Sequence, residues 1–181
     1  MTVLITGGAK NGKSLLAQDL TLQLAKGGRH YYVATMIPSD AEDDRRIVRH
    51  LEERAGLGFE TIECGRNILS CLEETEPGAA FLLDSVTALL MNELFPDPAS
   101  PEMDREAPER VARQMVAFAQ AVDNAVIVSD AIYADAALYD EVTETYRKGL
   151  AKVDRALAAV CDTVLEIVAG NIIIHKGGLP L

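Results

Sequence analysis

Residues 7–14 of the chain read Gly7-Gly8-Ala9-Lys10-Asn11-Gly12-Lys13-Ser14. The first and last glycines, the lysine and the serine have the spacing of the motif G-x-x-x-x-G-K-[ST], which binds nucleotide phosphates. An apolar strand pattern, Val3–Thr6, precedes the stretch, and a helix pattern with leucines at every fourth position, Ser14–Lys26, follows it. A chance glycine-rich turn would lack this strand and this helix. The stretch therefore predicts a phosphate-binding loop, or P-loop.

All eight residues of the P-loop are predicted to contact nucleotide. Small residues let the backbone curl, so that successive N–H groups point at phosphate oxygens, and the following helix presents its positive N-terminal end to the same anion. Lys13 is expected to bridge the β and γ phosphates and to take part in catalysis. The hydroxyl of Ser14 is expected to complete the coordination of Mg²⁺. The expected substrates are ATP and GTP.

Asp84 is the second candidate metal ligand. It ends the apolar run Phe81-Leu82-Leu83, and P-loop enzymes hold Mg²⁺ with an acid at the end of another buried strand. The alternative is that Asp84 only caps a helix predicted over Ser85–Leu94, because aspartate is a favoured N-cap residue. The pattern favours contact with the metal or the nucleotide.

Apolar runs rich in β-branched residues alternate with helical patterns along the whole chain, including a helix expected over Ala107–Val122. This alternation predicts one α/β domain over residues 1–181, of P-loop NTPase type, with a mostly parallel sheet of about seven strands flanked by helices. Gly170-Asn171 predicts a tight turn and hence a final antiparallel hairpin. The proline-rich stretch Pro96–Pro108 predicts an exposed loop. The expected strands are Val3–Thr6, Tyr31–Thr35, Phe59–Glu63, Ala80–Asp84, Ala125–Ser129, Thr163–Val168 and Ile172–His175.

Composition argues against nucleic acid and membrane as partners. The chain of 181 residues has a formal net charge of −11 and no cluster of basic residues, so it would repel a phosphodiester backbone. No segment approaches the roughly 18 apolar residues of a membrane span. Its three cysteines, Cys64, Cys71 and Cys161, form no C-x-x-C pair and are expected to be buried thiols. These features predict a cytoplasmic protein.

His50 lies in a highly charged helix pattern, Asp40–Arg54. Taken alone, a histidine on such a helix is more often an ordinary surface residue. Arg46 and Arg49 are close to it along the helix, however, and would attract a phosphate. An imidazole can attack phosphorus and later release it, so a nucleophilic role stays open. The other two histidines, His30 and His175, are expected to be structural or exposed.

Several stretches follow a pattern beyond the P-loop. They are Leu4–Ser14, Tyr32–Thr35, Arg46–His50 with Glu60–Glu63, Leu82–Thr87 with Asn92–Phe95, and Val164–Lys176. They resemble the L-[IV]-T-G-G-A-[RK]-S-G-K-S, Y-[IV]-A-T, R-I-x-x-H with x-T-x-E, [LI]-L-[DE]-[CS]-[LIV]-T and closing V-x-x-[IV]-x-x-G…K segments of one family. That family is the bifunctional adenosylcobinamide kinase/adenosylcobinamide-phosphate guanylyltransferases of corrinoid (vitamin B12) assembly, of which this chain looks like a divergent member.

The resemblance implies a two-step reaction. ATP or GTP first phosphorylates the aminopropanol hydroxyl of the corrinoid; GTP then guanylylates a histidine, which by resemblance is His50, and the corrinoid phosphate takes the GMP. The resemblance also implies a homotrimer. Outside the P-loop, the nucleotide contacts that it implies are Ala34, Thr35, Met36, Leu51, Glu52, Glu53, Arg54, Glu63 and Asp84.

Three segments depart from the family pattern. The family's N-E-V-G after the fifth strand is replaced within Ser129–Tyr133, its R-P-x-x-W after the histidine is replaced within Arg54–Phe59, and its G-x-x-N-Q is replaced within Leu150–Arg155. Two further readings therefore stay open: a small-molecule kinase that uses the P-loop alone, and a regulatory protein in which bound nucleotide sets the conformation.

Overall fold

A seven-stranded sheet runs through the centre of the computed structural model, which describes residues 1–39, 41–133 and 135–179. The strand order is β3-β2-β4-β5-β1-β6-β7, with β7 antiparallel to β6 and all other neighbours parallel. The strands are β1 (Thr2–Gly7), β2 (His30–Ala34), β3 (Glu60–Glu63), β4 (Ala80–Asp84), β5 (Asn124–Val128), β6 (Thr163–Val168) and β7 (Asn171–Lys176).

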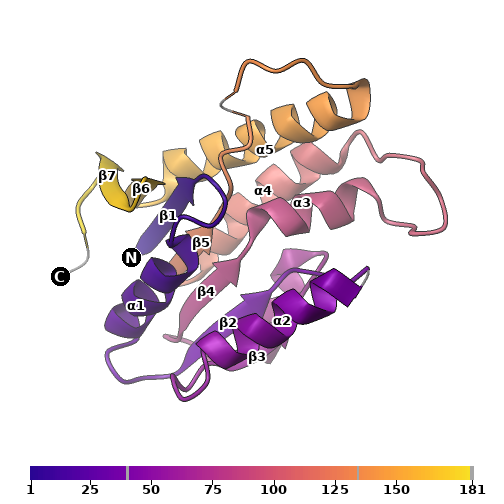
Figure 1. Ribbon diagram of the computed structural model, residues 1–181. Helices are drawn as coiled ribbons and strands as arrows, with labels where there is room; N and C mark the ends of the chain where they lie inside the picture. The colour runs from indigo at the N-terminus through magenta and orange to yellow at the C-terminus, as the bar shows by residue number, and fades with distance from the viewer. Residues whose placement is uncertain (40, 134, 180–181) are drawn as a thin grey trace.

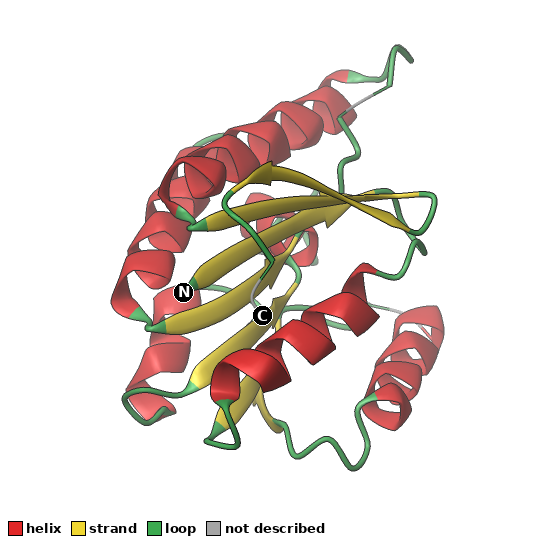
Figure 2. Ribbon diagram, turned by 90° about the vertical axis from the view of Figure 1, so that its left-hand side faces the viewer, coloured by secondary structure: helices red, strands yellow, loops and turns green. Residues whose placement is uncertain are grey.

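Helices cover both faces of this sheet (Figures 1 and 2). α1 and α2 lie on one face, and α3, α4, α5 and the 3₁₀ helix η1 lie on the other. The helices are α1 (Lys13–Ala25), α2 (Ala41–Glu53), η1 (Ile68–Glu74), α3 (Val86–Leu94), α4 (Ala107–Ala121) and α5 (Glu141–Val160).

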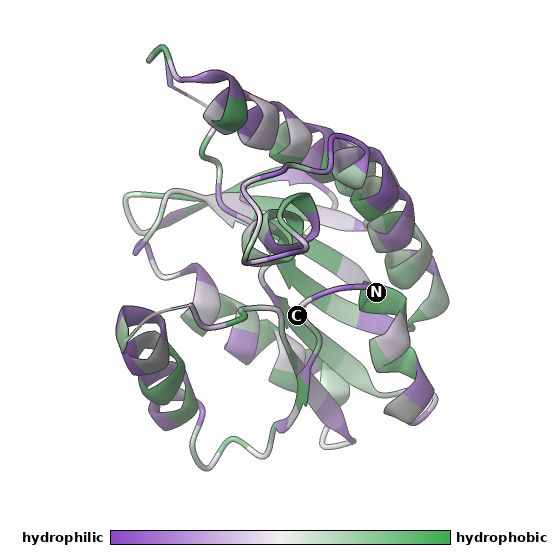
Figure 3. Cartoon of the chain, turned by 90° about the vertical axis from the view of Figure 1, so that its right-hand side faces the viewer, coloured by the Kyte–Doolittle hydropathy of each residue, from purple (hydrophilic) through white to green (hydrophobic). Residues whose placement is uncertain are grey.

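The two faces of the central strands supply two hydrophobic layers. Side chains alternate along a strand, so Val3 and Ile5 of β1 pack with α1, whereas Leu4 packs with the helices of the other face. The same strands are almost continuously hydrophobic in Figure 3, and both faces are covered, as expected of a parallel sheet. Because the central strands are parallel, their carboxyl ends meet at one edge of the sheet, where Gly7, Ala34 and Asp84 lie.

The predicted fold class is confirmed. Each predicted strand overlaps an observed one, and β6 and β7 form the predicted antiparallel hairpin. The prediction that Pro96–Pro108 forms an exposed loop is wrong at its end, because Pro108 is buried in the first turn of α4, where a proline needs no N–H partner. All three cysteines are buried free thiols, as predicted. In the part of the chain that the structure describes, no helix is long and apolar enough to cross a membrane.

Candidate active site

The P-loop connects β1 to α1, and two glycines fix its path. Gly7 has φ of 140°, and a Cβ there would lie 2.5 Å from the carbonyl oxygen of Ile167 in β6. Gly12 is the N-cap of α1 and has a left-handed conformation with φ of 92°. Other residues adopt such angles only with strain. Gly8, Ala9 and Lys10 between them are exposed, so the backbone of the turn is open to a ligand.

Lys13 is buried in the first turn of α1, and its ammonium group turns back over the P-loop. Nζ donates a hydrogen bond to the carbonyl oxygen of Gly8 at 2.6 Å and lies 2.8 Å from Oδ1 of Asp130. Asn11 ties the turn to β6, because its side-chain amide donates to the carbonyl oxygen of Ile167. Asp130 follows β5 and was not among the residues that the sequence singled out.

Ser14 and Asp84, the two predicted metal ligands, lie side by side. The Ser14 hydroxyl donates to Oδ2 of Asp84 at 3.3 Å, and the Tyr32 hydroxyl donates to the same oxygen at 3.0 Å. The alternative role of Asp84 as a helix cap is wrong: the N-cap of α3 is Ser85, whose side chain accepts a hydrogen bond from the backbone N–H of Ala88. The Asp84 carboxylate therefore faces the P-loop.

Arg54 links this site to the end of α2. Its side chain is buried, its guanidinium carbon lies 3.9 Å from the centre of the Tyr32 ring, and it donates to the Thr61 hydroxyl at 3.1 Å. A guanidinium over an aromatic face is attracted by the ring electrons. Contacts therefore run from Arg54 through Tyr32 and Asp84 to Ser14, which joins the segment after α2 to the P-loop.

His50 lies in the last turn of α2 and is half-buried. Its carbonyl oxygen accepts a hydrogen bond from the backbone N–H of Arg54 at 3.3 Å, which places it one turn before the anchored arginine. Leu51 and Glu52, expected to contact nucleotide, are exposed on the same turn. The side chain of Glu53, expected to do the same, lies outside the described part of the structure.

The remaining residues implied by the resemblance lie at the carboxyl ends of β2 and β3. Thr35 is fully buried and joins the end of β2 to the end of β4: its hydroxyl donates to the carbonyl oxygen of Ser85 and accepts from the Ser85 N–H, both at 2.7 Å. This side chain is already committed within the protein. Ala34 and Met36 are half-buried beside it, and Glu63 is exposed.

A buried acid of α5 lies close to the segment that follows β5. Asp154 of α5 is only 5% exposed, and Tyr133 donates a hydrogen bond to its Oδ2 at 2.9 Å. Its Oδ1 is buried with no hydrogen-bond partner among the residues that the structure describes. Burial raises the pKa of this carboxyl to about 6, the hydroxyls of Ser129 and Tyr133 oppose the rise, and the Asp130 charge adds to it.

Comparison with known proteins identifies the family. A family profile described as cobinamide kinase / cobinamide phosphate guanyltransferase matches residues 3–174. The chain belongs to this family. Two bifunctional adenosylcobalamin biosynthesis proteins are similar to this chain. CobU of Salmonella typhimurium is 27% identical over 179 residues, which cover 94% of this chain and 97% of CobU. CobP of Pseudomonas aeruginosa is 30% identical over 172 residues, which cover 94% of each chain.

Two solved structures have a fold similar to that of this chain. A KaiC-like protein of Pyrococcus horikoshii OT3 has a TM-score of 0.52 at 17% identity, over 97% of this chain and 78% of that one. A second Pyrococcus horikoshii OT3 protein has a TM-score of 0.54 at 13% identity, and the match covers 97% of this chain and 86% of that protein. At these identities the likeness concerns the fold alone, and it agrees with a P-loop NTPase architecture. The predicted family and its transferase class, kinase and guanyltransferase of cobalamin biosynthesis, are confirmed.

Proposed function

We propose that this chain phosphorylates adenosylcobinamide with ATP or GTP and then transfers GMP from GTP to that phosphate through a covalent intermediate on His50. Family membership gives the reaction class. The observation that carries the residue assignment is the meeting of Lys13, Ser14 and Asp84 at the P-loop, where a buried ammonium group, a hydroxyl and a carboxylate surround an open turn of backbone. One phosphate site then serves both half-reactions.

Ser14 and Asp84 fit a Mg²⁺ ion. Both offer oxygen, the donor that Mg²⁺ prefers, and Oδ2 of Asp84 already accepts the Ser14 hydrogen bond. No three His, Cys, Asp or Glu side chains of the described residues gather as a metal site, which suits an ion held by one carboxylate, a hydroxyl and substrate phosphates. When bound, Mg²⁺ would neutralise charge on the phosphate oxygens.

In the first half-reaction the P-loop holds the triphosphate, and Lys13 stabilises the charge that develops on the transferred phosphoryl group. The amides of Gly8, Ala9 and Lys10 lie in the exposed turn and are free of the sheet ladder. The corrinoid hydroxyl forms a bond to the γ-phosphorus while the bond to the β–γ bridging oxygen breaks, leaving a nucleoside diphosphate.

In the second half-reaction His50 acts as the nucleophile. Its imidazole bonds to the α-phosphorus of GTP and pyrophosphate leaves; the corrinoid phosphate then displaces the imidazole and keeps the GMP. Arg54, one turn further along, holds the end of α2 against Tyr32. The other proposed nucleotide contacts are Leu51, Glu52, Glu53, Glu63 and residues 34–36. Within this set Thr35 has a supporting role, because its hydroxyl, N–H and carbonyl oxygen all have hydrogen-bond partners in the protein.

Labelling tests this assignment of His50. The protein is incubated with α-labelled GTP and Mg²⁺, denatured, and assayed for acid-labile label on the chain. We expect label on the wild type and on His175→Asn, a control whose histidine pairs with Glu166 on the terminal hairpin, but not on His50→Asn. Undiminished label on His50→Asn, or none on the wild type, would remove the guanylyltransferase step as drawn.

The two half-reactions need separate assays because the Ser129–Tyr133 segment departs from the family pattern. Transfer of γ-label from ATP and from GTP to cobinamide measures the first step and its nucleotide preference. Phosphorylation without label on His50 would leave the small-molecule kinase. Nucleotide binding without either transfer would favour the regulatory protein.

The assembly and setting of the chain are further parts of the proposal. We take residues 1–181 as one domain that forms a homotrimer in the cytoplasm. An edge strand that exposes Ile172, Ile173 and Ile174 favours association. A net charge of −11 disfavours nucleic acid as a partner. Sedimentation equilibrium tests the trimer, and a monomer at micromolar concentration contradicts it.

A further inference from the structure

Asp130 occupies a position in the site for which neither the sequence pattern nor the family description gives a role. It follows β5, the strand that separates Asp84 on β4 from the P-loop on β1. Its Oδ1 lies 2.8 Å from Nζ of Lys13, and the side chain is 27% exposed. The carboxylate is therefore next to the group that holds the γ-phosphate and is still open to a substrate.

The backbone around Asp130 is held from several sides. Its N–H donates to the Thr87 hydroxyl of α3 at 3.0 Å. The N–H of Ser129 donates to the carbonyl oxygen of Ile5 at 2.9 Å. The N–H of Ala131 donates to the carbonyl oxygen of Gly7 at 3.0 Å. The carboxylate thus stands on backbone that is fixed to both the P-loop strand and α3.

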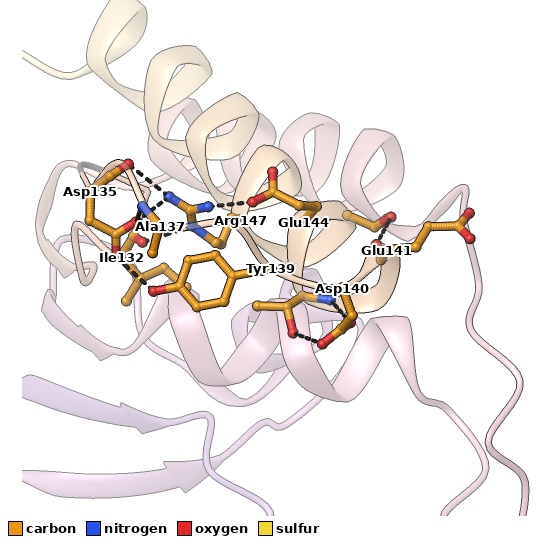
Figure 4. A network of polar contacts seen from close by, with 10 residues as sticks. Ile132, Asp135, Ala137, Tyr139, Asp140, Glu141, Glu144 and Arg147 are labelled. Atoms are coloured by element: carbon orange, nitrogen blue, oxygen red, sulfur yellow. Dashed lines mark hydrogen bonds and ion pairs between the residues drawn. The ribbon is translucent and has the colours of Figure 1, made fainter.

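A network on α5 holds the rest of this connection (Figure 4). Arg147 is buried and donates to the carbonyl oxygen of Ile132 at 3.2 Å and to Oδ1 of Asp135 at 2.8 Å. It also pairs with Glu144, and its guanidinium carbon lies 4.5 Å from the centre of the Tyr139 ring. The segment that carries Asp130 is therefore anchored at both ends.

The two carboxylates of the site have different neighbours. Asp84 accepts hydrogen bonds from Ser14 and Tyr32, on the side where the metal ligands lie. Asp130 contacts Lys13. A triphosphate that binds the P-loop attracts the ammonium group of Lys13 to its own oxygens, which leaves the Asp130 carboxylate beside the γ-phosphate without its cation. A free carboxylate at that place can accept a hydrogen bond from an incoming hydroxyl.

We propose that Asp130 is the general base of the phosphorylation step, accepting the proton of the acceptor hydroxyl. This rests on the proposed kinase function. The hydroxyl oxygen bonds to the γ-phosphorus, the bond to the β–γ bridging oxygen breaks with its electron pair going to the nucleoside diphosphate, and the hydroxyl proton passes to an Oδ of Asp130. The partly exposed carboxyl then returns the proton to solvent. The guanylylation of His50 involves no hydroxyl acceptor and does not need Asp130.

The test compares Asp130→Asn with Asp130→Glu and with Asp123→Asn, an exposed aspartate at the opposite end of β5. Single-turnover transfer of γ-label to cobinamide is measured at saturating nucleotide, together with nucleotide affinity and α-label on His50. We expect Asp130→Asn to slow phosphoryl transfer about 100-fold or more. Nucleotide affinity and label on His50 should stay within about threefold, Asp130→Glu should recover part of the rate, and Asp123→Asn should match the wild type.

Three results would overturn the role of Asp130 while leaving the kinase intact. One is transfer by Asp130→Asn within about threefold of the wild type. Another is recovery of its rate at high Mg²⁺, which would make Asp130 a metal ligand. A third is a parallel loss of label on His50, which would indicate damage to the whole site. A wild-type protein that transfers no phosphate to cobinamide contradicts the proposed function itself, and that result is seen without any variant.

Discussion

The P-loop and helix α2 carry the two predicted catalytic residues in very different surroundings. Lys13 is buried, and the loop before it is shaped by a close approach of Gly7 to β6. His50 lies on a charged helix with apolar side chains, Val48 and Leu51, exposed to solvent. In the described residues α2 packs on no other element as extensively as α1 packs on the central strands. The phosphate site is built into the core, whereas the histidine is carried on a peripheral helix.

With His50 as the proposed acceptor of GMP, the two half-reactions place different demands on the fold. A phosphate site works by fixed N–H groups and a fixed cation, which a rigid loop between strand and helix supplies. A histidine that receives GMP and then passes it on has to meet two different partners. The contacts from Arg54 through Tyr32 to Asp84 tie the peripheral helix to the core at one end. Variants along that path can separate the two regions.

Lys13→Ala should have the largest effect on activity, and it should impair both half-reactions equally. If one phosphate site serves both reactions, as we propose, phosphorylation of cobinamide and label on His50 should both fall about 10²- to 10³-fold. Lys148→Ala, which removes an exposed lysine of α5 away from the P-loop, is the control and should retain the activity of the wild type. Loss of only one reaction would mean that the two regions bind separate nucleotides.

Asp154→Asn should change how the stability of the core depends on pH. Burial raises the pKa of Asp154 in the folded protein to about 6 from 3.8, so the folded state binds the proton more tightly than the unfolded state does. The stability that this proton gives is fully present below about pH 3.8 and is lost as the pH rises through about 6, by up to about 3 kcal/mol in total. Asp154→Asn has no carboxyl group to deprotonate at this position, so its stability does not fall in this way.

Urea denaturation at pH 4.5 and 7.5 measures the effect. Relative to the wild type, Asp154→Asn should be more stable at pH 7.5 than at pH 4.5 by about 1–3 kcal/mol. Asp135→Asn is a control, because the pKa of the exposed Asp135 is lowered, chiefly by the Tyr139 hydroxyl, rather than raised. The same pH dependence for the wild type and Asp154→Asn would contradict a buried carboxyl that titrates near pH 6.

Arg54→Lys should loosen the attachment of α2. A lysine keeps the charge but loses the planar stacking on Tyr32 and the geometry of the hydrogen bond to Thr61. We expect a loss of about 1–2 kcal/mol in the free energy of unfolding. Label on His50 should fall more than phosphorylation does. Arg45→Lys, exposed on the same helix, should change neither, and equal losses in both reactions would deny that α2 is a separate region.

Tyr32→Phe should have the smallest effect, and it isolates one contact on the path from Arg54 to Asp84. It keeps the ring under Arg54 and removes the hydroxyl that donates to Asp84, a hydrogen bond worth about 1 kcal/mol. Phosphorylation at limiting Mg²⁺ should therefore fall about fivefold. Tyr31→Phe is the control, because the Tyr31 hydroxyl accepts a hydrogen bond from the Glu76 N–H instead. Equal behaviour of the two variants would show that Tyr32 does not position Asp84.

The fold and the P-loop could be predicted because their determinants are local. Strand, glycine-rich turn and helix follow one another in sequence, and β1 and α1 lie where the pattern predicts them. The proximity of Ser14 and Asp84 followed from the rule that parallel strands bring their carboxyl ends to one edge. The helix cap was harder to assign, because Asp84 and Ser85 are both good N-cap residues and only the backbone geometry distinguishes them.

The rest of the site depends on contacts between distant segments. Nothing in the run Ser129–Tyr133 predicts that Asp130 meets Lys13, because the pairing requires β5 to lie beside β1. The charged residues before Arg54 in the sequence suggest an exposed side chain. In the structure the Arg54 side chain is buried and lies over the Tyr32 ring. Asp154 lies mid-helix, and its burial follows from which face of α5 meets the sheet.

The pairing of Lys13 with Asp130 has a consequence for which anions the empty protein retains. An anion that binds Lys13 has to replace two partners of its ammonium group, the Asp130 carboxylate at 2.8 Å and the carbonyl oxygen of Gly8. The net charge of −11 on the chain also repels it. A triphosphate offers more charged oxygens to the turn and to Lys13 than orthophosphate does, so it replaces the displaced contacts more fully. The internal ion pair thus weakens the binding of every anion, and a polyphosphate compensates for that cost with more contacts than a single phosphate can make.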